Sequence, residues 1–293
     1  MSECFKSFTY DGKSTETIIS PVKLMLATFD GINSVVGVSR EIQKGGTTIT
    51  RPVANEYGTV ANNATIEYCL IKDNFEPFTE QEQVAVERWL TSPKFSTDMI
   101  VYDTDDEEVC IYRGLFTNTS WIPHSRGYAG VQFTFECNTA YPFKKYKKDY
   151  TITQSETITL NCESDELNEY VYPVLTVMET SETAYVRVIN KTDNDNVMNI
   201  RALDRLKTIF DCKHCIPTDE TRSGVISYAD LGWDDVGNIY WLRLLPGDNQ
   251  LEIHVSNKNV NEETGEISWE DIDSSAEISI SYECPYKLVG GWL

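Results

Sequence analysis

The chain has 293 residues, of which 41% are hydrophobic and 24% charged, and its formal net charge is −21. This composition is typical of a folded globular protein and argues against an intrinsically disordered chain. No apolar run approaches the roughly 20 residues needed to cross a bilayer, so we expect no membrane insertion.

The charge is unevenly distributed along the chain. Residues 1–148 carry 15 basic and 19 acidic side chains, a net −4, whereas residues 149–293 carry 10 and 27, a net −17. Nucleic-acid binding requires Lys and Arg to neutralise phosphates, so the acidic second half disfavours it. The N-terminus has no cationic stretch followed by an apolar one, and we therefore expect synthesis in the cytoplasm without a secretory signal.

Strand patterns dominate the first half. Residues 8–10, followed by Asp11-Gly12, predict a strand that enters a tight turn. Other β-favouring runs bounded by turn residues predict further strands in this half. These strands are expected over residues 63–71, 99–103, 109–113 and 131–137.

A β-hairpin is predicted around Gly45-Gly46. Ile42 and Ile49 stand on either side of the two glycines within polar alternation. The favoured two-residue hairpin turn needs positive φ at both central positions, which glycine supplies. The sequence therefore predicts a turn at this pair.

One helix is predicted in the first half, over about residues 79–91. It begins with a capping-box pattern, in which Thr79 caps the third helical amide and Glu82 reaches back to the start. An apolar stripe suited to lie on a sheet follows: Val86, Trp89 and Leu90. Pro93 marks the end of the helix.

A domain boundary is expected between residues 148 and 149, at the end of the basic cluster 144–148. Many short strands separated by turn signals predict a β-sandwich beyond it. These strands are expected over residues 151–153, 157–160, 171–177, 184–189, 208–212, 240–245, 251–255 and 276–282. Residues 200–210 suit either strands or a helix.

The sequence contains no constellation typical of an enzyme. Its three histidines, His124, His214 and His254, are not at metal-ligand spacing. It has no nucleophile elbow, phosphate-cradling glycine loop or dinucleotide fingerprint. We therefore predict no enzymatic activity, no cofactor and no metal site.

The eight cysteines are expected to be reduced thiols, since no secretion signal is present. Cys212-Lys213-His214-Cys215 matches half of a zinc knuckle or a redox pair. A structural zinc usually needs a second such pair, and the sequence has none. A redox pair needs a βαβ context, which the pattern of this sequence lacks. We favour a strand end running into a turn.

Two other features admit alternatives. The acidic run 103–108 has carboxylates for calcium but lacks the glycine and terminal glutamate of an EF-hand loop, so a solvated hairpin tip is favoured. Four tryptophans have positions that would suit stacking on sugars, although packing in a core or interface is favoured over a lectin role. They are Trp121, Trp233, Trp241 and Trp292.

Several motifs, taken in their order and spacing, resemble the distal tail proteins of long-tailed bacteriophages and of related tail-like particles. In the first half they are residues 8–14, 40–45, 79–93, 112–116 and 130–143. In the second half they are residues 209–212, 242–249 and 278–282. The resemblance covers nearly the whole chain.

The resemblance implies a mainly β chain. Residues 1–148 would form an N-terminal β-sandwich with one helix and a hairpin, and residues 149–293 a galectin-like β-sandwich. The first domain would assemble into a hexameric ring at the phage tail tip, in the virion. The ring would contact the tail tube protein, the tape measure protein and a tail-associated fibre or hydrolase protein. The resemblance also makes residues 200–210 strand, turn and strand, and it supplies no catalytic residues.

We place the ring interface in the first half, because its milder charge reduces repulsion between copies. The candidate interface residues lie in the predicted hairpin: Arg40, Lys44, Gly45, Gly46 and Arg51. Two other functions stay open at this point. One is another ring-forming tail tube component, and the other is a carbohydrate-binding β-sandwich module in host-surface recognition.

Overall fold

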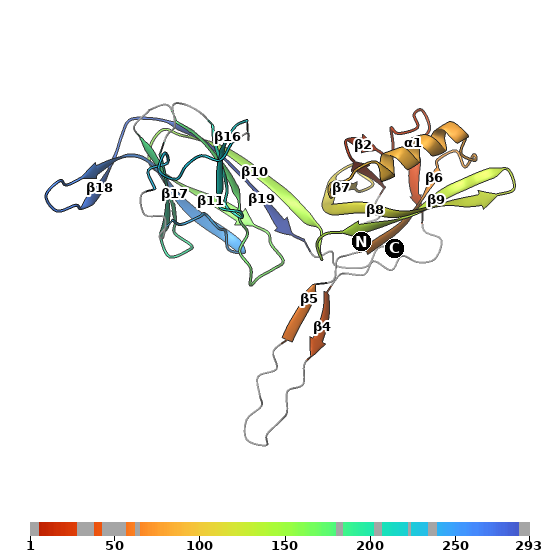
Figure 1. Ribbon diagram of the computed structural model, residues 1–293, viewed down its shortest axis with the longest axis horizontal. Coiled ribbons are helices and arrows are strands. Elements are labelled where there is room, and N and C mark those ends of the chain that lie inside the picture. Colours follow the sequence, from red (N-terminus) through yellow and green to blue (C-terminus); the bar gives the residue numbers. More distant parts are fainter. Residues whose placement is uncertain are drawn as a thin grey trace, which may run out of the picture. The chain divides into compact units, whose positions relative to one another are not determined.

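The computed structural model describes residues 6–27, 38–42, 57–61, 65–179, 184–201, 207–221, 224–233 and 239–286. The described residues form two compact units. The first contains those up to Lys144 together with Tyr286, and the second is drawn from Lys145–Pro285 (Figure 1). The boundary that we expected after residue 148 lies within strand β10 (Phe143–Ile152), which begins in the first unit and continues in the second.

The first unit consists of antiparallel strands and one helix. The strands are β1 (Ser7–Tyr10), β2 (Lys13–Ser14), β3 (Leu24–Ala27), β4 (Val38–Ile42), β5 (Tyr57–Ala61), β6 (Thr65–Lys72), β7 (Thr97–Tyr102), β8 (Glu108–His124) and β9 (Gly127–Cys137). The predicted tight turn joins β1 to β2, where Asp11 and Gly12 have φ of 47° and 71° and Tyr10 pairs with Lys13. Positive φ at both central residues matches the hairpin twist, so this prediction is confirmed.

Strand β8 belongs to two layers of the first unit. Its first half pairs with β7, which pairs with β1, and its second half pairs with β9, which pairs with β6. The change takes place at Gly114, which pairs with both Thr97 and Cys137. A Cβ atom at this glycine would lie 2.1 Å from the carbonyl oxygen of Glu136. Only glycine fits this approach of two backbones.

Helix α1 (Glu80–Thr91) has the predicted capping box. The amide of Glu82 donates to Thr79 Oγ1 at 3.3 Å, and the amide of Thr79 donates to Glu82 Oε2 at 2.7 Å. The predicted stripe of Val86, Trp89 and Leu90 is buried. Trp89 stacks on Phe8 with ring centroids 5.3 Å apart, which fixes the helix on the aromatic core.

The predicted hairpin exists but has a different register. β4 and β5 pair antiparallel with Ile42 opposite Tyr57, whereas a two-residue turn at Gly45-Gly46 would place Ile42 opposite Ile49. The observed register of β4 and β5 is therefore not the one that a two-residue turn at Gly45-Gly46 would impose. The predicted turn itself falls in the segment between the two strands. Residues 43–56 lie outside the described part of the chain.

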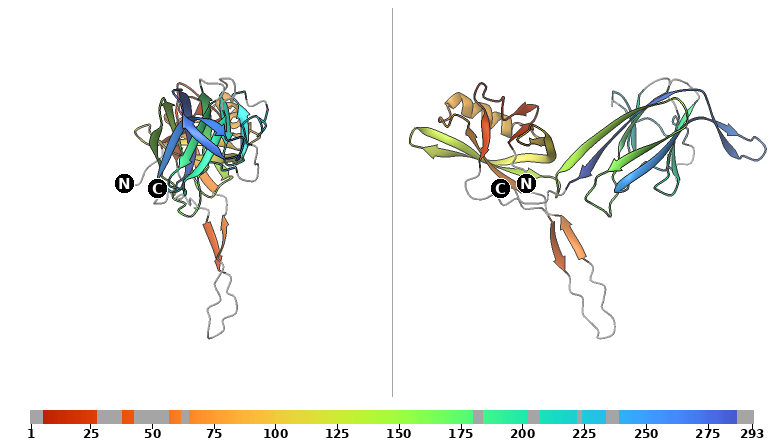
Figure 2. Two further views of the ribbon diagram at one scale, coloured as in Figure 1. Left: turned by 90° about the vertical axis from the view of Figure 1, so that its left-hand side faces the viewer. Right: turned by 180° about the vertical axis from the view of Figure 1, so that it is seen from behind.

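The second unit is a sandwich of two antiparallel sheets (Figures 1 and 2). One sheet contains, in spatial order, β16 (Ile216–Asp219), β15 (Thr208–Asp211), β12 (Val174–Glu179), β19 (Ala276–Pro285) and β10. The other contains β11 (Glu156–Cys162), β17 (Gly247–Val260), β13 (Tyr185–Asn190) and β14 (Asn196–Arg201), and β18 (Ile267–Asp271) pairs with the far end of β17.

Alternate side chains of both sheets meet in the core of the second unit. Leu175 and Ile280 come from one sheet, and Val186 and Ile253 from the other, and all four have no exposed surface. A mainly β chain with β-sandwich domains is thus confirmed. Among the described residues, no helix has the length and apolar character required to cross a membrane.

One expectation for the second unit is wrong, and one choice that the residues left open is decided in favour of the strands that the resemblance implied. Residues 240–245 are not a strand, since Leu244 alone makes a bridge, to Val171. The stretch 200–210 contains the end of β14 and the start of β15 instead of a helix, while residues 202–206 between them lie outside the described part. The residues alone suit either a helix or strands, and the pairing of β14 with β13 and of β15 with β12 decides for strands.

Candidate functional site

The Cys212–Cys215 motif forms the turn between β15 and β16. Cys212 is buried and Cys215 is exposed, with φ of 57°. Burial raises the pKa of the Cys212 thiol to about 12, which disfavours the thiolate that a metal or redox site needs. Among the described residues, no group of three His, Cys, Asp or Glu side chains is arranged to hold a metal.

The acidic run 103–108 is the tip of the β7–β8 hairpin, as predicted. Asp103 Oδ1 accepts hydrogen bonds from the amides of Asp105 at 2.8 Å and Glu107 at 2.9 Å. These bonds use this carboxylate oxygen to shape the turn. The solvated hairpin tip is therefore the correct interpretation of the run.

The tryptophans that suggested sugar stacking are packed into the cores. Trp233 is only 8% exposed and packs edge-on against Trp241, with centroids 5.3 Å apart. Trp121 packs edge-on against Phe78 at 5.2 Å, and Trp292 lies outside the described residues. Core packing is thus confirmed for Trp233, and Trp241 and Trp121 are partly buried against the two cores.

A polar cluster that the sequence did not reveal lies on the outer face of β17. His254 Nδ1 is 2.9 Å from Ser155 Oγ and 3.0 Å from Asp271 Oδ2. Ser155 also donates to Asp271, and Ser256 Oγ donates to the other oxygen of Asp271 at 2.7 Å. Burial alone would raise the pKa of Asp271, but the hydrogen bonds from Ser155, His254 and Ser256 lower it to about 2.

This cluster contains the residue types of a hydrolase triad in a different geometry. In a triad the carboxylate and the nucleophile occupy opposite nitrogens of the imidazole. Here Ser155 and Asp271 share Nδ1, and the serine hydroxyl is engaged by the carboxylate. Nε2 lies 3.0 Å from Glu252 Oε1, but its alignment is outside that of a hydrogen bond. The arrangement ties β18 and the loop before β11 to β17.

A sequence signal for this cluster was available. Glu252, His254 and Ser256 alternate along β17 and therefore lie on one face of the strand. Asp271 and Ser155 come from other segments, and only the strand pairing brings them to that face.

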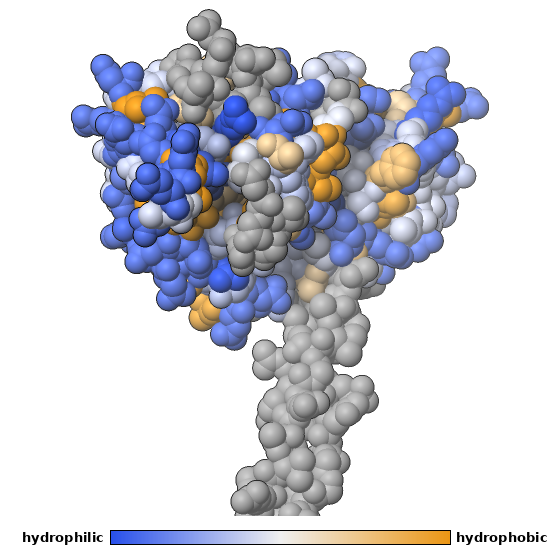
Figure 3. All heavy atoms as spheres, turned by 60° about the vertical axis from the view of Figure 1, so that its left-hand side comes forward, coloured by the Kyte–Doolittle hydropathy of each residue, from blue (hydrophilic) through white to orange (hydrophobic). Residues whose placement is uncertain are grey.

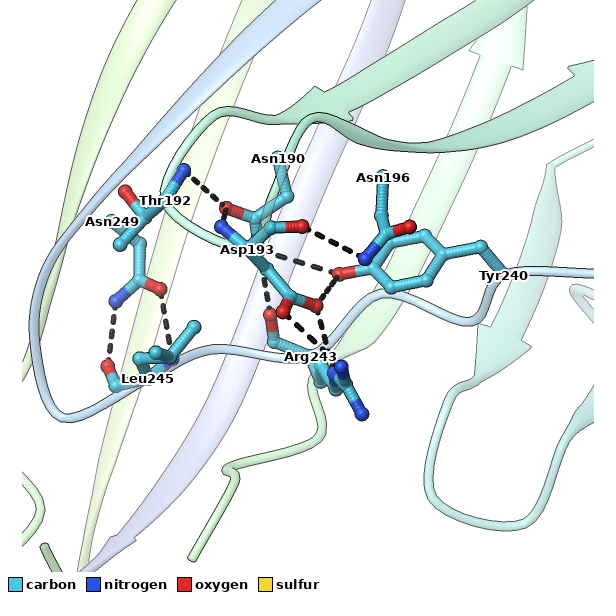
Figure 4. A network of polar contacts seen from close by, with 8 residues as sticks. All are labelled: Asn190, Thr192, Asp193, Asn196, Tyr240, Arg243, Leu245 and Asn249. Atoms are coloured by element: carbon cyan, nitrogen blue, oxygen red, sulfur yellow. Dashed lines mark hydrogen bonds and ion pairs between the residues drawn. The ribbon is translucent and has the colours of Figure 1, made fainter. Parts of the chain in front are cut away.

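A second polar network is centred on Asp193 in the turn between β13 and β14 (Figure 4). Asp193 Oδ2 accepts from Arg243 Nε at 2.7 Å and from Tyr240 Oη at 2.9 Å. The Arg243 side chain also donates Nη2–H to Oδ1 at 3.1 Å and lies 4.0 Å from the ring centre of Tyr170. The hydrogen bond to Arg243 holds the pKa of Asp193 below its usual value.

Two asparagines complete this network and explain why residues 240–245 are not a strand. Asn190 Nδ2 donates to the carbonyl of Arg243 at 2.8 Å. Asn249 bonds both the amide and the carbonyl of Leu245, at 2.8 and 2.7 Å. These side chains replace the partners that a neighbouring strand would supply. The network anchors this segment beside the β13–β14 turn.

The surface offers apolar side chains for contacts with other molecules. In the first unit Phe75 and Phe95 flank helix α1 in sequence and are 76% and 83% exposed. In the second unit Val260 and Ile267 pair at the tip of the β17–β18 arm and are half-exposed. On the face shown in Figure 3, hydrophobic atoms form small groups within a hydrophilic surface.

Residues 4–139 match the family model described as the phage tail protein N-terminal domain. This match covers the described part of the first unit apart from residues 140–144 and Tyr286. The first unit thus matches phage tail protein N-terminal domains over most of its length. The resemblance to phage tail proteins inferred from the motifs is confirmed.

The fold of this chain is similar to that of a solved phage protein. The Dit protein of phage SPP1, described as a paradigm of the hub adsorption apparatus in phages infecting Gram-positive bacteria, is 14% identical with a TM-score of 0.56. That alignment covers 97% of this chain and 100% of the SPP1 chain. A chain of the phage P2 baseplate in its activated conformation with calcium is 9% identical with a TM-score of 0.49, covering 94% and 97%. No curated protein matches the sequence.

The predicted interface residues lie in sequence between the start of β4 and the start of β5. Arg40 is in β4, where the structure describes the backbone alone. The other four lie outside the described residues: Lys44, Gly45, Gly46 and Arg51. Their role in a subunit interface stays a prediction.

Proposed function

We propose that this protein is the distal tail component of a long-tailed phage, forming a hexameric ring at the tail tip. The observation that carries the proposal is the fold shared with SPP1 Dit along nearly the full length of both chains. The ring would join the tail tube and tape measure proteins to a tail-associated fibre or hydrolase protein. The protein would be assembled in the host cytoplasm and act in the virion.

The first domain, proposed as residues 1–148, would build the ring. A ring requires a heterologous interface that closes by rotation, and apolar side chains at such an interface are covered by the next copy. Phe75 and Phe95 are candidates for this role because both are largely exposed, whereas most aromatic rings in the described part of this domain are buried. The β4–β5 hairpin, with Arg40, remains the other proposed contact.

The second domain, proposed as residues 149–293, would lie at the periphery of the ring. Its net charge of −17 favours a solvated position or a basic partner surface. The β17–β18 arm combines a half-exposed apolar pair with Glu262, Glu263 and Glu266 in its loop. We assign this arm to contact with the proteins below the ring.

A structural role without catalysis agrees with the geometry of the polar clusters. In the His254 cluster, the Ser155 hydroxyl and the Asp271 carboxylate bond within the cluster. In the Asp193 network, the Asp193 carboxylate bonds Arg243 and Asn190 bonds the carbonyl of Arg243. Both clusters fix loops. The sugar-binding alternative loses its main feature with the burial of Trp233.

The test is the oligomeric state of the purified full chain by native mass spectrometry and negative-stain microscopy, alone and mixed with the purified tail tube protein. Six copies of 33.4 kDa would give a species of about 200 kDa. Phe95→Ser should weaken the ring, whereas Leu167→Ser, at an exposed apolar position in the second domain, should leave it intact. Monomers under both conditions would contradict the proposal.

A further inference from the structure

Two buried thiols of the second domain lie against each other. Cys162 Sγ is 3.5 Å from Cys284 Sγ, and both residues are only 1% exposed. Cys162 is the last residue of β11 and Cys284 lies near the end of β19. The two strands belong to opposite sheets of the sandwich, so the pair spans its core.

Hydrogen bonds on both sides of the pair hold the two strands in place. Tyr282 Oη donates to the carbonyl of Asn161 at 2.7 Å. The amide of Asp165 donates to the carbonyl of Pro285 at 3.0 Å. Each of the four residues in these bonds lies within three positions of one of the cysteines. The proximity of the sulfurs is therefore a property of the fold at this end of the sandwich.

We propose that Cys162 and Cys284 are an oxidative cross-linking site, reduced during synthesis and joined as a disulfide in an oxidising medium. The sulfurs must approach by roughly 1.5 Å to reach the bond length of about 2.05 Å. That is a small change for side chains at strand ends. Cys162 lies on β11, which pairs with β17 alone among the described strands, so opening of this edge strand would admit the oxidant.

The oxidant is a low-molecular-weight disulfide. The Cys162 thiolate attacks one of its sulfurs, forming a mixed disulfide and releasing one thiolate. Cys284, after losing its proton to solvent, attacks the Cys162 sulfur and releases the second thiolate. Two protein thiols are oxidised by two electrons, and one disulfide is reduced to two thiols. The hydrogen bond from Cys284 lowers the pKa of Cys162 and raises that of Cys284, in keeping with this order of attack.

The cross-link would restrain a long segment of the unfolded chain, since its two residues are 122 positions apart. A disulfide that closes a long loop raises the unfolding temperature, here by about 5–15 °C. The change of medium follows from the proposed function, because a virion protein passes from the host cytoplasm to the outside of the cell. The oxidation step itself does not depend on ring assembly.

The experiment is peptide mapping of the full-length protein after incubation with glutathione disulfide, alkylation and trypsin digestion. We expect residues 149–187 linked to residues 259–287, and a higher unfolding temperature for the second domain that dithiothreitol reverses. Cys162→Ser should abolish both effects. Cys212→Ser, which removes an equally buried thiol of the same core, should retain them.

Recovery of both peptides from oxidised wild-type protein as separate alkylated species would overturn the proposal. This measurement needs no variant, so it stays decisive if Cys162→Ser fails to fold. A cross-link between Cys284 and a different cysteine would also overturn it. A monomeric protein that still forms the 162–284 cross-link would refute the ring alone.

Discussion

Asp193 is 3% exposed, and its carboxylate receives three hydrogen bonds from Tyr240 and Arg243. A buried carboxylate without partners would be costly, but here the guanidinium and the phenol satisfy both oxygens. Arg243 in turn is held over the ring of Tyr170. At the scale of single residues, such hydrogen-bonded networks hold the β13–β14 turn and the segment around Arg243 in place.

Asp193→Asn should lower the free energy of unfolding of the second domain by about 2–3 kcal/mol, since it removes charge-assisted bonds to a partly buried arginine. Urea unfolding monitored by tryptophan fluorescence measures this. Asp195→Asn is the control, because that exposed carboxylate pairs with Lys191 on the surface and should change the stability by less than about 0.5 kcal/mol.

Wild type and Asp193→Asn also test how the stabilisation by Asp193 depends on pH. The pKa of Asp193 is lowered in the folded state, so its stabilisation is present above the unfolded-state pKa of about 3.9 and is lost as the pH falls through the folded-state value. The difference between wild type and Asp193→Asn should therefore shrink below about pH 4. A difference that stays constant down to acid unfolding would show that the carboxylate charge is unimportant.

Strand β8 shows how a single element organises the first domain. It passes from one layer to the other at Gly114, where its backbone meets that of Glu136. Helix α1 then covers the aromatic core formed beside this crossing, with Trp89 Nε1 donating to the carbonyl of Tyr10 at 2.7 Å. The strand crossing and the capped helix are thus the elements on which the proposed ring domain depends.

Gly114→Ala should destabilise the first domain by about 3 kcal/mol, because the new methyl group would overlap the Glu136 carbonyl and push β9 away from β8. Differential scanning calorimetry of the full chain provides the measurement. Gly224→Ala, where a Cβ meets no atom within 4 Å, should be close to neutral. Equal behaviour of the two variants would argue against the close approach.

Thr79→Ala should cost about 1 kcal/mol, since it removes the side-chain acceptor for the Glu82 amide at the start of α1. Thr91→Ala at the other end of the helix should have little effect, because its hydroxyl bonds only within the helix and alanine has the higher helix propensity. Urea midpoints of the first domain compare the two. A larger loss for Thr91→Ala would contradict the capping assignment.

At the scale of the whole molecule, the described residues form two hydrophobic cores that share no residue. The first is rich in aromatic rings around Phe8 and Trp89, and the second joins two sheets through Phe210 and aliphatic side chains. Most of the net negative charge is carried by residues 149–293, the half of the sequence that contains the second core. Separate cores allow one chain to combine a ring-forming part with a differently charged part.

We expect two thermal transitions that respond to separate mutations. Trp89→Ala should lower only the transition of the first domain and Phe210→Ala only that of the second, each by removing a fully packed ring worth about 3–5 kcal/mol. Calorimetry of the full chain and both variants is the measurement. A single transition that shifts with either mutation would mean that the two cores unfold as one unit.

Local patterns by themselves determined the capped helix, the Asp11-Gly12 turn, most strands and the packing of Trp241 against the second core, because caps, positive-φ turns and apolar alternation depend on neighbours in sequence. Only the tertiary structure decided the hairpin register, the irregular segment 240–245, the His254 cluster and the Cys162–Cys284 pair. In each of these, at least one deciding partner lies on a different segment of the chain, and local patterns do not specify which one. Strand pairing and side-chain hydrogen bonds to the backbone then override local preference.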